Sequence, residues 1–329
     1  MMFIIMHFLR FLLKNKFGRR CIFLLLTDVL EEYLYHIQVE NYSHRTIKGY
    51  KNNNLAFFRF IEADFNITEL EKVKPLHIKA YFMYLNKLGR KPTYVNGILR
   101  NIRSFFAYCM KEDYVTKDNN PCLKVGWLKQ DKPVINTFND DEIGKMIQSY
   151  KPTSWLNMRN KLILMFFADC GIRASELIDI CEDDILETNI KIRGKGRKER
   201  YVPISPVLKK NMIKYERMKE FYFKDKLLTH SNYFVSYRCL PLTTEALLYV
   251  VKRAGESAKV RKSVRCSPHT IRHYYAQKNL RMGNDIYSLS RLLGHTTVNI
   301  TKIYLESIED ESIVEKGRMH SPLMNLHKK

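Results

Sequence analysis

The chain has 329 residues, 45% of them hydrophobic, which is typical of a folded protein and enough for two domains with separate cores. Its formal net charge of +22 indicates a polyanionic partner, nucleic acid or an anionic membrane, although a lysine-rich genome would account for part of the excess. The seven cysteines form no C-x-x-C pair, which fits buried thiols in a reducing cytoplasm rather than a disulfide framework.

Residues 1–26 are apolar but are interrupted by five Arg and Lys residues. No uninterrupted run therefore approaches the roughly 20 residues that a helix needs to cross a bilayer. The scattered charges also differ from the single apolar core of a signal peptide. We expect an ill-defined extension, either an accessory helix or the product of an upstream start codon.

Residues 27–118 show the apolar spacing of four amphipathic helices. We expect Thr27 to cap the first helix and Thr46 the second, the third to follow Pro75, and the fourth to begin near Pro92 or Thr93. Four helices of this length predict a small bundle.

Residues 119–137 carry turn chemistry and predict a linker, after which three acids open a new helix. The second domain is expected over residues 138–318, with a tail at 319–329. It contains an apolar helix from Trp155 to Cys170 and alternating runs at 189–193 and 200–204 that predict a β-hairpin. The predicted fold class is mainly α with a small hairpin: an N-terminal helical bundle followed by an α+β domain.

Three further features are expected in the second domain. Helices are predicted from Pro206 to Lys226 and from Leu242 to Ala258, the latter capped by Thr243. Residues 233–235 suggest a short strand between them.

The stretch from His269 to Tyr304 carries the chemistry. His269 and Arg272 are three residues apart, hence on one face of a helix. His295 follows Gly294, a residue at which a helix should end, and Tyr304 lies nine residues further on. Arginine binds phosphate through two charge-assisted hydrogen bonds, imidazoles donate hydrogen bonds or move protons, and a tyrosine hydroxyl can act as a covalent nucleophile. This set predicts attack on a phosphodiester without a metal.

The same motifs resemble the C-terminal signature of the tyrosine recombinases, the phage integrase family, in its simple Xer-like form. Arg173 stands in Gly171-Ile-Arg-Ala-Ser-Glu-Leu177, which is similar to the segment that carries the family's first arginine. Lys195 stands in the run from Gly194 to Pro203, which is similar to the family's lysine-bearing hairpin. Four motifs in the family's order over 132 residues make a specific resemblance.

The resemblance implies a mechanism. Arg173 and Arg272 would bind the non-bridging oxygens of one phosphate, and His269 and His295 would hydrogen-bond the same group. Tyr304 would attack and form a 3′-phosphotyrosine. Lys195 would protonate the leaving 5′ oxygen, and His269 could accept the tyrosine proton. No metal, cofactor or ATP is expected.

The resemblance also implies partners. They are double-stranded DNA, which the family clamps between two domains, and further copies of the chain, four on two DNA sites. We expect the protein in the cytoplasm, associated with the nucleoid, and we expect no membrane partner. The basic residues that we expect to contact phosphates, each otherwise read as part of a solvated face, are Arg100, Arg103, Arg197, Lys198, Lys252, Arg253, Arg261 and Lys262.

Other interpretations remain open at this point. A zinc site at Cys266, His269 and His273 is disfavoured because Arg272 shares the helix face, and His273 is expected to be a packed or capping histidine. Glu176 could orient Arg173 by an ion pair. The tyrosines at 274, 275 and 287 are expected in the core. The alternative functions are an architectural DNA-binding protein with a vestigial site and relaxation of DNA as by a type IB topoisomerase.

Overall fold

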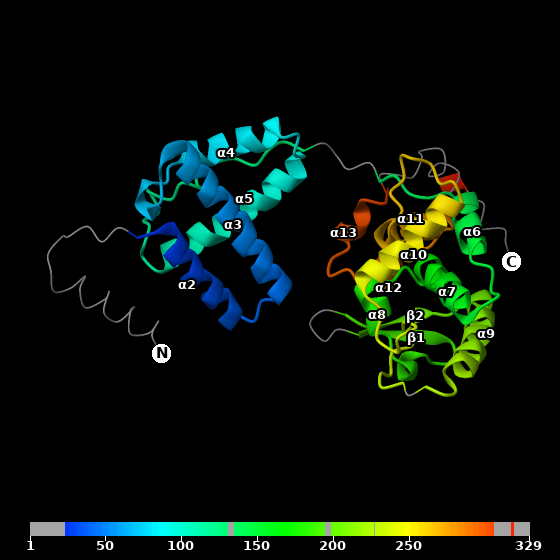
Figure 1. Ribbon diagram of the computed structural model, residues 1–329. Coiled ribbons are helices and arrows are strands. Elements are labelled where there is room, and N and C mark those ends of the chain that lie inside the picture. The colour runs from blue at the N-terminus through cyan, green and yellow to red at the C-terminus, as the bar shows by residue number, and fades with distance from the viewer. Residues whose placement is uncertain (1–23, 131–134, 195–198, 227, 306–316, 319–329) are drawn as a thin grey trace. The chain divides into compact units, whose positions relative to one another are not determined.

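The computed structural model describes residues 24–130, 135–194, 199–226, 228–305 and 317–318. The chain divides into two compact units, residues 1–132 and 133–329, each with its own apolar core (Figure 1). Within the described ranges, no helix is both long enough and apolar enough to cross a membrane. The predicted fold class, mainly helical with one small hairpin, is confirmed.

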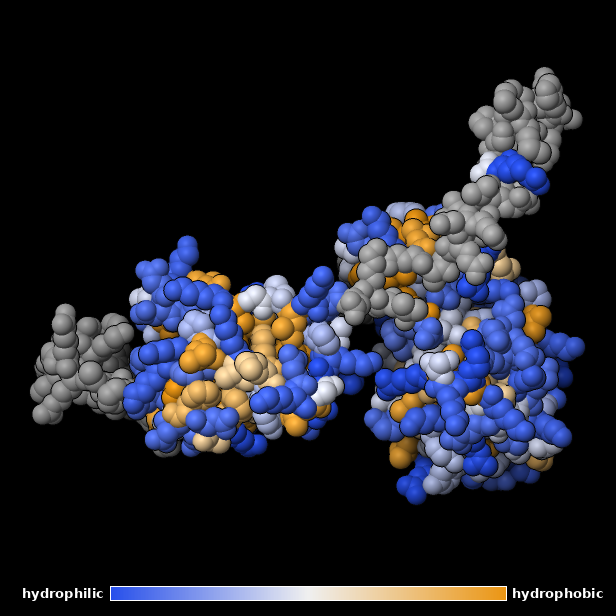
Figure 2. Space-filling view, turned by 90° about the horizontal axis from the view of Figure 1, so that it is seen from above, coloured by the Kyte–Doolittle hydropathy of each residue, from blue (hydrophilic) through white to orange (hydrophobic). Residues whose placement is uncertain are grey.

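The N-terminal unit contains the four expected helices: α2 (Leu26–Val39), α3 (His44–Phe65), α4 (Pro75–Lys87) and α5 (Pro92–Lys111), with a single turn, η1 (Leu70–Lys72), before α4. Their apolar faces meet in one core. Figure 2 shows that apolar residues also reach the visible surface of this unit, between hydrophilic ones.

Both predicted caps in this unit were wrong. The side chain of Ser43 caps α3 by accepting a hydrogen bond from the backbone N–H of Thr46, so Thr46 lies inside the first turn. Since Ser43 is as good a cap as threonine, the earlier start adds helical residues. Helix α2 begins one residue before Thr27 and has no side-chain cap.

The chain after α5 packs back on that helix. The Asn96 amide exchanges two hydrogen bonds with the Leu128 backbone, both of 2.9 Å. Arg103 donates to the Val125 carbonyl at 2.6 Å, and its guanidinium lies 4.3 Å from the ring centre of Trp127. Much of the segment expected as a linker therefore lies against the helical unit, as far as Leu128.

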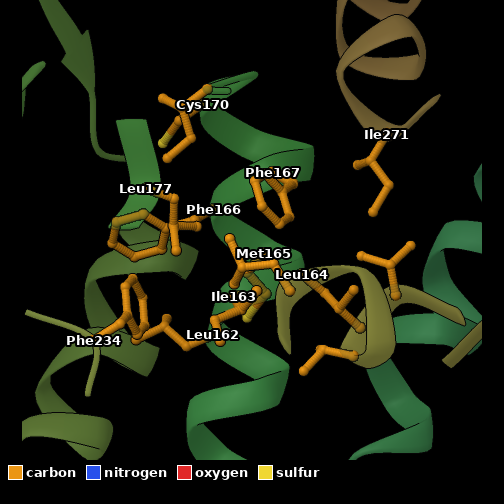
Figure 3. Packing of buried hydrophobic residues seen from close by; sticks show 14 of the residues in the cluster. Leu162, Ile163, Leu164, Met165, Phe166, Phe167, Cys170, Leu177, Phe234 and Ile271 are labelled. Atoms are coloured by element: carbon orange, nitrogen blue, oxygen red, sulfur yellow. The ribbon is translucent and has the colours of Figure 1, made fainter. Parts of the chain in front are cut away.

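The C-terminal unit is built around α7 (Trp155–Cys170), which is buried on nearly every side. Figure 3 shows its side chains Leu162 to Phe167 packed together with Leu177, Phe234 and Ile271. These partners come from three separate segments, so α7 fixes their relative positions. Helix α6 (Asp140–Ser149) precedes α7, and α8 (Ala174–Asp179) and a single turn, η2 (Glu182–Asp184), follow it.

The predicted hairpin is present as β1 (Asn189–Arg193) and β2 (Glu199–Pro203), which pair antiparallel with Ile190 opposite Val202. The predicted strand at residues 233–235 was wrong, because only isolated bridges form there. Side chains occupy the carbonyls that a strand would use: Tyr215 donates to the Tyr233 oxygen and Arg159 to the Val235 oxygen.

Helices α9 (Pro206–Phe223) and α10 (Thr244–Ser257) agree with the predictions, and Thr243 caps α10. They are followed by α11 (Pro268–Arg281), α12 (Ile286–Leu293) and α13 (Asn299–Lys302). Tyr275 is buried as expected, and Tyr274 is half-buried with its hydroxyl on Asp140. Tyr287 is 62% exposed, so its assignment to the core was wrong.

Candidate active site

Gly171 brings the end of α7 against α11. Its φ of +59° ends α7 in the left-handed region, and a Cβ there would lie 2.2 Å from the Tyr275 ring. Any other residue would be strained and would push α11 away. The Gly171 carbonyl accepts a hydrogen bond from Arg272 Nη1 at 2.7 Å, so the helix end fixes one arginine of the site.

A second glycine, Gly294, ends α12 with φ of +64°, and a Cβ there would lie 2.8 Å from Arg200 Nη1. Three consecutive carbonyls at this helix end accept hydrogen bonds from three arginines: Leu292 from Arg200 (2.7 Å), Leu293 from Arg272 (2.6 Å) and Gly294 from Arg173 (3.2 Å). The last carbonyls of a helix lack helical partners and carry partial negative charge. The end of α12 therefore gathers three guanidinium groups from β2, α11 and the start of α8.

The Glu176 carboxylate joins the same three arginines. It accepts from Arg173 Nη1 at 2.6 Å and from both terminal nitrogens of Arg200 at 2.8 Å, while Arg272 Nη1 lies 4.0 Å away. Burial alone would raise the pKa of Glu176, but hydrogen bonds and charge from Arg200 and Arg173 lower it to about 2. The expected pairing of Glu176 with Arg173 is thus present, and one carboxylate faces three guanidinium groups, which leaves excess positive charge.

The two arginines named by the sequence differ in exposure. The Arg272 side chain is 2% exposed, whereas that of Arg173 is 41% exposed. Burial and the nearby Arg173 lower the pKa of Arg272 to about 10, so it remains charged at neutral pH. An incoming anion would therefore meet one buried and one accessible guanidinium, and guanidinium N–H groups make strong charge-assisted hydrogen bonds to phosphate oxygens.

The His295 ring is held from α13. Its Nδ1 and the Thr301 hydroxyl are 2.8 Å apart in a hydrogen bond, and Thr301 is fully buried. Burial, then the charges of Arg272 and Arg173, lower the pKa of His295 to about 4, so the ring is neutral at neutral pH. His269 lies in the first turn of α11, and burial together with Arg272 also lowers its pKa.

Tyr304 contacts an unexpected histidine. Its hydroxyl lies 2.9 Å from His273 Nδ1, and the His273 and His269 rings meet edge-on with 4.3 Å between their centres. His273, which the sequence predicted to be a packed or capping histidine, is half-buried and in addition shares a hydrogen bond with the Tyr304 hydroxyl. His273 is four residues after His269, so both rings lie on one face of α11.

Tyr304 is also fixed by packing. It is 2% exposed, it belongs to a small cluster with Tyr275 and Leu293, and its backbone N–H donates to the Thr301 carbonyl. Burial raises the pKa of Tyr304, whereas the charges of Arg272 and Arg173 act to lower it. The phenol is therefore protonated at neutral pH and must lose a proton before or during any attack.

The remaining candidate residues are scattered. Lys195, Arg197 and Lys198 lie outside the described residues. Arg100, Lys252, Arg253 and Lys262 are exposed. Arg261 is held by Glu142 and the Thr137 carbonyl, and Arg103 by Val125 and Trp127, so these two also have structural contacts. Within the described ranges, no three His, Cys, Asp or Glu side chains are grouped as a metal would require.

Sequence reasoning missed Arg200, His273 and Thr301. The signal for His273 was its spacing from His269. Arg200 was predicted only as part of the β-hairpin, but it stands opposite buried Ile192 in the register, and its side chain is 12% exposed. Thr301 carried no signal, because its role depends on the turn that brings α13 back to His295.

Comparisons with known proteins agree with this geometry. Residues 136–311 match the model of the phage integrase family, and residues 27–116 match the family's N-terminal SAM-like domain. The tyrosine recombinase XerC of Thermodesulfovibrio yellowstonii is 31% identical over 280 residues, covering 84% of this chain and 90% of the relative. XerC of Listeria innocua is 29% identical over 296 residues, covering 87% and 93%.

A solved structure of the same fold is the XerH site-specific recombinase bound to palindromic difH substrate in a post-cleavage complex. It has a TM-score of 0.70 and 19% identity, and the match covers 89% of this chain and 84% of that one. The match to the family model, which spans more than half of the chain, and the 31% identity to a XerC decide the assignment. The chain belongs to the phage integrase family and is a tyrosine recombinase, an enzyme that cuts and rejoins DNA.

Proposed function

We propose that this chain recombines double-stranded DNA at specific sites through attack of Tyr304 on one phosphodiester. The tyrosine oxygen bonds to phosphorus, the 5′ oxygen leaves, and a 3′-phosphotyrosine keeps the energy of the broken bond. The 5′-hydroxyl of another strand then attacks the phosphotyrosine and rejoins the DNA, so that no ATP is needed.

The arginines would supply the electrostatic part of catalysis. Arg173 and Arg272 would hydrogen-bond the non-bridging oxygens and stabilise the charge that builds up in the transition state. Both are already anchored on carbonyls at the end of α12, and Glu176 neutralises only part of their charge. A site that is positioned before the substrate arrives needs little reorganisation during the reaction.

His295 and His269 would donate hydrogen bonds to the same phosphate. The Thr301 hydroxyl fixes the orientation of the His295 ring, which is neutral and can donate through the nitrogen that Thr301 leaves available. Lys195 would protonate the departing 5′ oxygen, because an alkoxide is a poor leaving group and a positioned acid contributes roughly 10²–10⁴-fold.

The partners follow from the reaction. Lambda integrase, a structure of the same fold, has been solved as a tetramer on a Holliday junction. We extend that arrangement to this chain: two protomers on each site and four in the complex that exchanges strands, acting on DNA in the cytoplasm. The exposed basic residues Arg100, Lys252, Arg253 and Lys262 would contact phosphates.

One observation carries the proposal. The Tyr304 hydroxyl is hydrogen-bonded to His273 on α11, the helix that also holds Arg272. The nucleophile and the buried phosphate-binding arginine are thus fixed to one rigid element.

The test is cleavage of a suicide DNA substrate, in which the fragment carrying the 5′-hydroxyl diffuses away. Wild type should accumulate a covalent adduct in EDTA, because guanidinium groups do the work of a metal. Tyr304→Phe should bind the same DNA and form no adduct. An adduct with Tyr304→Phe, or cleavage that needs added magnesium, would contradict the proposal. Strand exchange between two sites separates recombination from simple relaxation.

A further inference from the structure

The hydrogen bond between Tyr304 and His273 raises the question of where the tyrosine proton goes. The two atoms, Tyr304 Oη and His273 Nδ1, are 2.9 Å apart. A neutral imidazole has one nitrogen with hydrogen and one with a lone pair. If the hydrogen is on Nε2, the Tyr304 hydroxyl donates to the Nδ1 lone pair, which is the arrangement that removes a proton from a nucleophile.

His269 is the competing acceptor on the same helix. It lies one turn nearer the start of α11 and contacts His273 edge-on, whereas the histidine that shares a hydrogen bond with the phenol is His273. His269 is the more exposed of the two rings, and His273 is half-buried between His269 and Tyr304. His269 is therefore placed to meet an incoming phosphate, and His273 to meet the nucleophile behind it.

We propose that His273 is the catalytic base that accepts the proton of Tyr304 when the tyrosine attacks DNA. This inference rests on the proposed function, because it assumes that Tyr304 is the nucleophile. During cleavage the Tyr304 O–H bond breaks as an N–H bond forms at His273 Nδ1, and the tyrosine oxygen bonds to phosphorus. The bond from phosphorus to the 5′ oxygen breaks, and that oxygen takes a proton from the general acid, Lys195 in the proposed function. During rejoining, His273 returns its proton to the tyrosine oxygen.

The surroundings of His273 suit this exchange. Burial, then His269 and Arg272, lower the pKa of His273 to about 4, so the ring is neutral and its lone pair is available at neutral pH. A weak base needs help to take a proton from a phenol. A bound phosphate brings negative charge beside the ring, which favours the imidazolium form as the proton arrives.

A fluorinated tyrosine at position 304 separates proton acceptance from packing. Fluorine makes the phenol more acidic, so its attack depends less on a base. His273→Ala should slow single-turnover cleavage of the suicide substrate by roughly 10²–10³-fold, in the range typical of general base catalysis, and leave DNA affinity unchanged. Fluorotyrosine should recover tenfold or more of that loss. His269→Ala should also be slow, but fluorotyrosine should not recover it, because the lost contact is to phosphate.

Two further variants keep the result interpretable. His273→Asn places an amide oxygen near the Nδ1 position, so it preserves the hydrogen bond to Tyr304 but cannot take a proton. It should be slow and recoverable like His273→Ala, even if alanine disturbs folding. His230→Ala, an exposed histidine in the same unit, should cleave like wild type.

The outcomes are distinguishable. Wild-type rates in His273→Ala or His273→Asn, or defects that fluorotyrosine leaves unchanged, would overturn the assignment. Recovery of His269→Ala in place of His273→Ala would move the base to His269. Failure of the wild type to form an adduct, or adduct formation by Tyr304→Phe, would instead overturn the proposed function.

Discussion

The two units of the chain differ in what they bury. Among the described residues, the buried polar side chains of the N-terminal unit are Asn54, His77, Asn96 and Asn120, none of which carries a permanent charge. Among the described residues, the C-terminal unit buries six Asp, Glu, Lys or Arg side chains: Glu142, Arg159, Glu176, Asp184, Lys219 and Arg272. A buried charge is costly unless it is paired and hydrogen-bonded. The second unit therefore depends on charge pairing in a way that the first does not.

The buried charges of the C-terminal unit fall into two kinds. Arg159 and Lys219 donate to carbonyls of the segment at Tyr233–Val235 and hold the fold together. Glu176 and Arg272 instead belong to a cluster with more cations than anions. Because Arg173 makes this cluster accessible from solvent, the excess of positive charge there is the better indicator of a site for an anion.

The largest expected effect comes from removing the buried cation. Arg272→Ala should reduce single-turnover cleavage by about 10²–10³-fold or more, since it removes transition-state contacts made in a water-poor site. Affinity for a whole DNA site should change little, because one phosphate contact is a small share of binding. Quench-flow cleavage and filter binding measure the two quantities.

Arg272→Lys sharpens this prediction. Lysine has no fork with which to reach both Gly171 and Leu293 carbonyls, so we expect it to behave much like alanine. The matched control is Arg217→Ala on α9, an exposed arginine that should leave both quantities unchanged. Near-normal cleavage by Arg272→Ala would show that the buried cluster is structural.

The next effect concerns stability. Glu176→Gln leaves Arg200 and Arg173 without their anion and should destabilise the C-terminal unit by about 3–5 kcal/mol, as expected when a buried ion pair loses one partner. Glu142→Gln is the control, because its partner Arg261 is 55% exposed and can be rehydrated. Urea unfolding should show a clearly smaller loss for Glu142→Gln. Equal losses of stability would show that the ion pairs of Glu176 contribute no more than the exposed pair of Glu142 with Arg261.

The same carboxylate gives a pH dependence. Its pKa is about 2 in the folded protein, below the unfolded value of about 4.3. The pairing therefore contributes stability that is fully present above about pH 4.3 and is lost as the pH falls towards 2. The difference in unfolding free energy between wild type and Glu176→Gln should shrink over that window, and a constant difference would contradict the assigned pairing.

The smallest effects are expected in the N-terminal unit. Arg100→Ala should weaken DNA binding a few-fold and reduce the slope of log affinity against log salt by roughly 0.9, the value for one phosphate contact. Arg103→Ala should instead destabilise this unit by about 1–2 kcal/mol, since Arg103 contacts Val125 and Trp127. Salt titrations of DNA binding and thermal unfolding distinguish the two variants. Weaker binding by Arg103→Ala together with lower stability of Arg100→Ala would show that Arg103 contacts phosphate and Arg100 stabilises the unit.

The sequence was sufficient where a local rule decides the structure. Helix periodicity predicted α3 to α5 and α7, and the glycines at 171 and 294 marked the helix ends that hold the arginines. Contacts between distant segments were not predictable in this way. That Arg200 of β2 reaches the end of α12 depends on tertiary packing, and the acceptors of the three arginines are backbone carbonyls, which any residue provides.

The most direct test of the account is the identity of the covalent bond to DNA. The adduct formed with a suicide substrate in EDTA would be digested with protease and nuclease, and its peptides sequenced by mass spectrometry. The account predicts one modified residue, Tyr304, joined to a 3′-phosphate, with a free 5′-hydroxyl on the released strand. A phosphate on any other residue, or a linkage to the 5′ end, would contradict it.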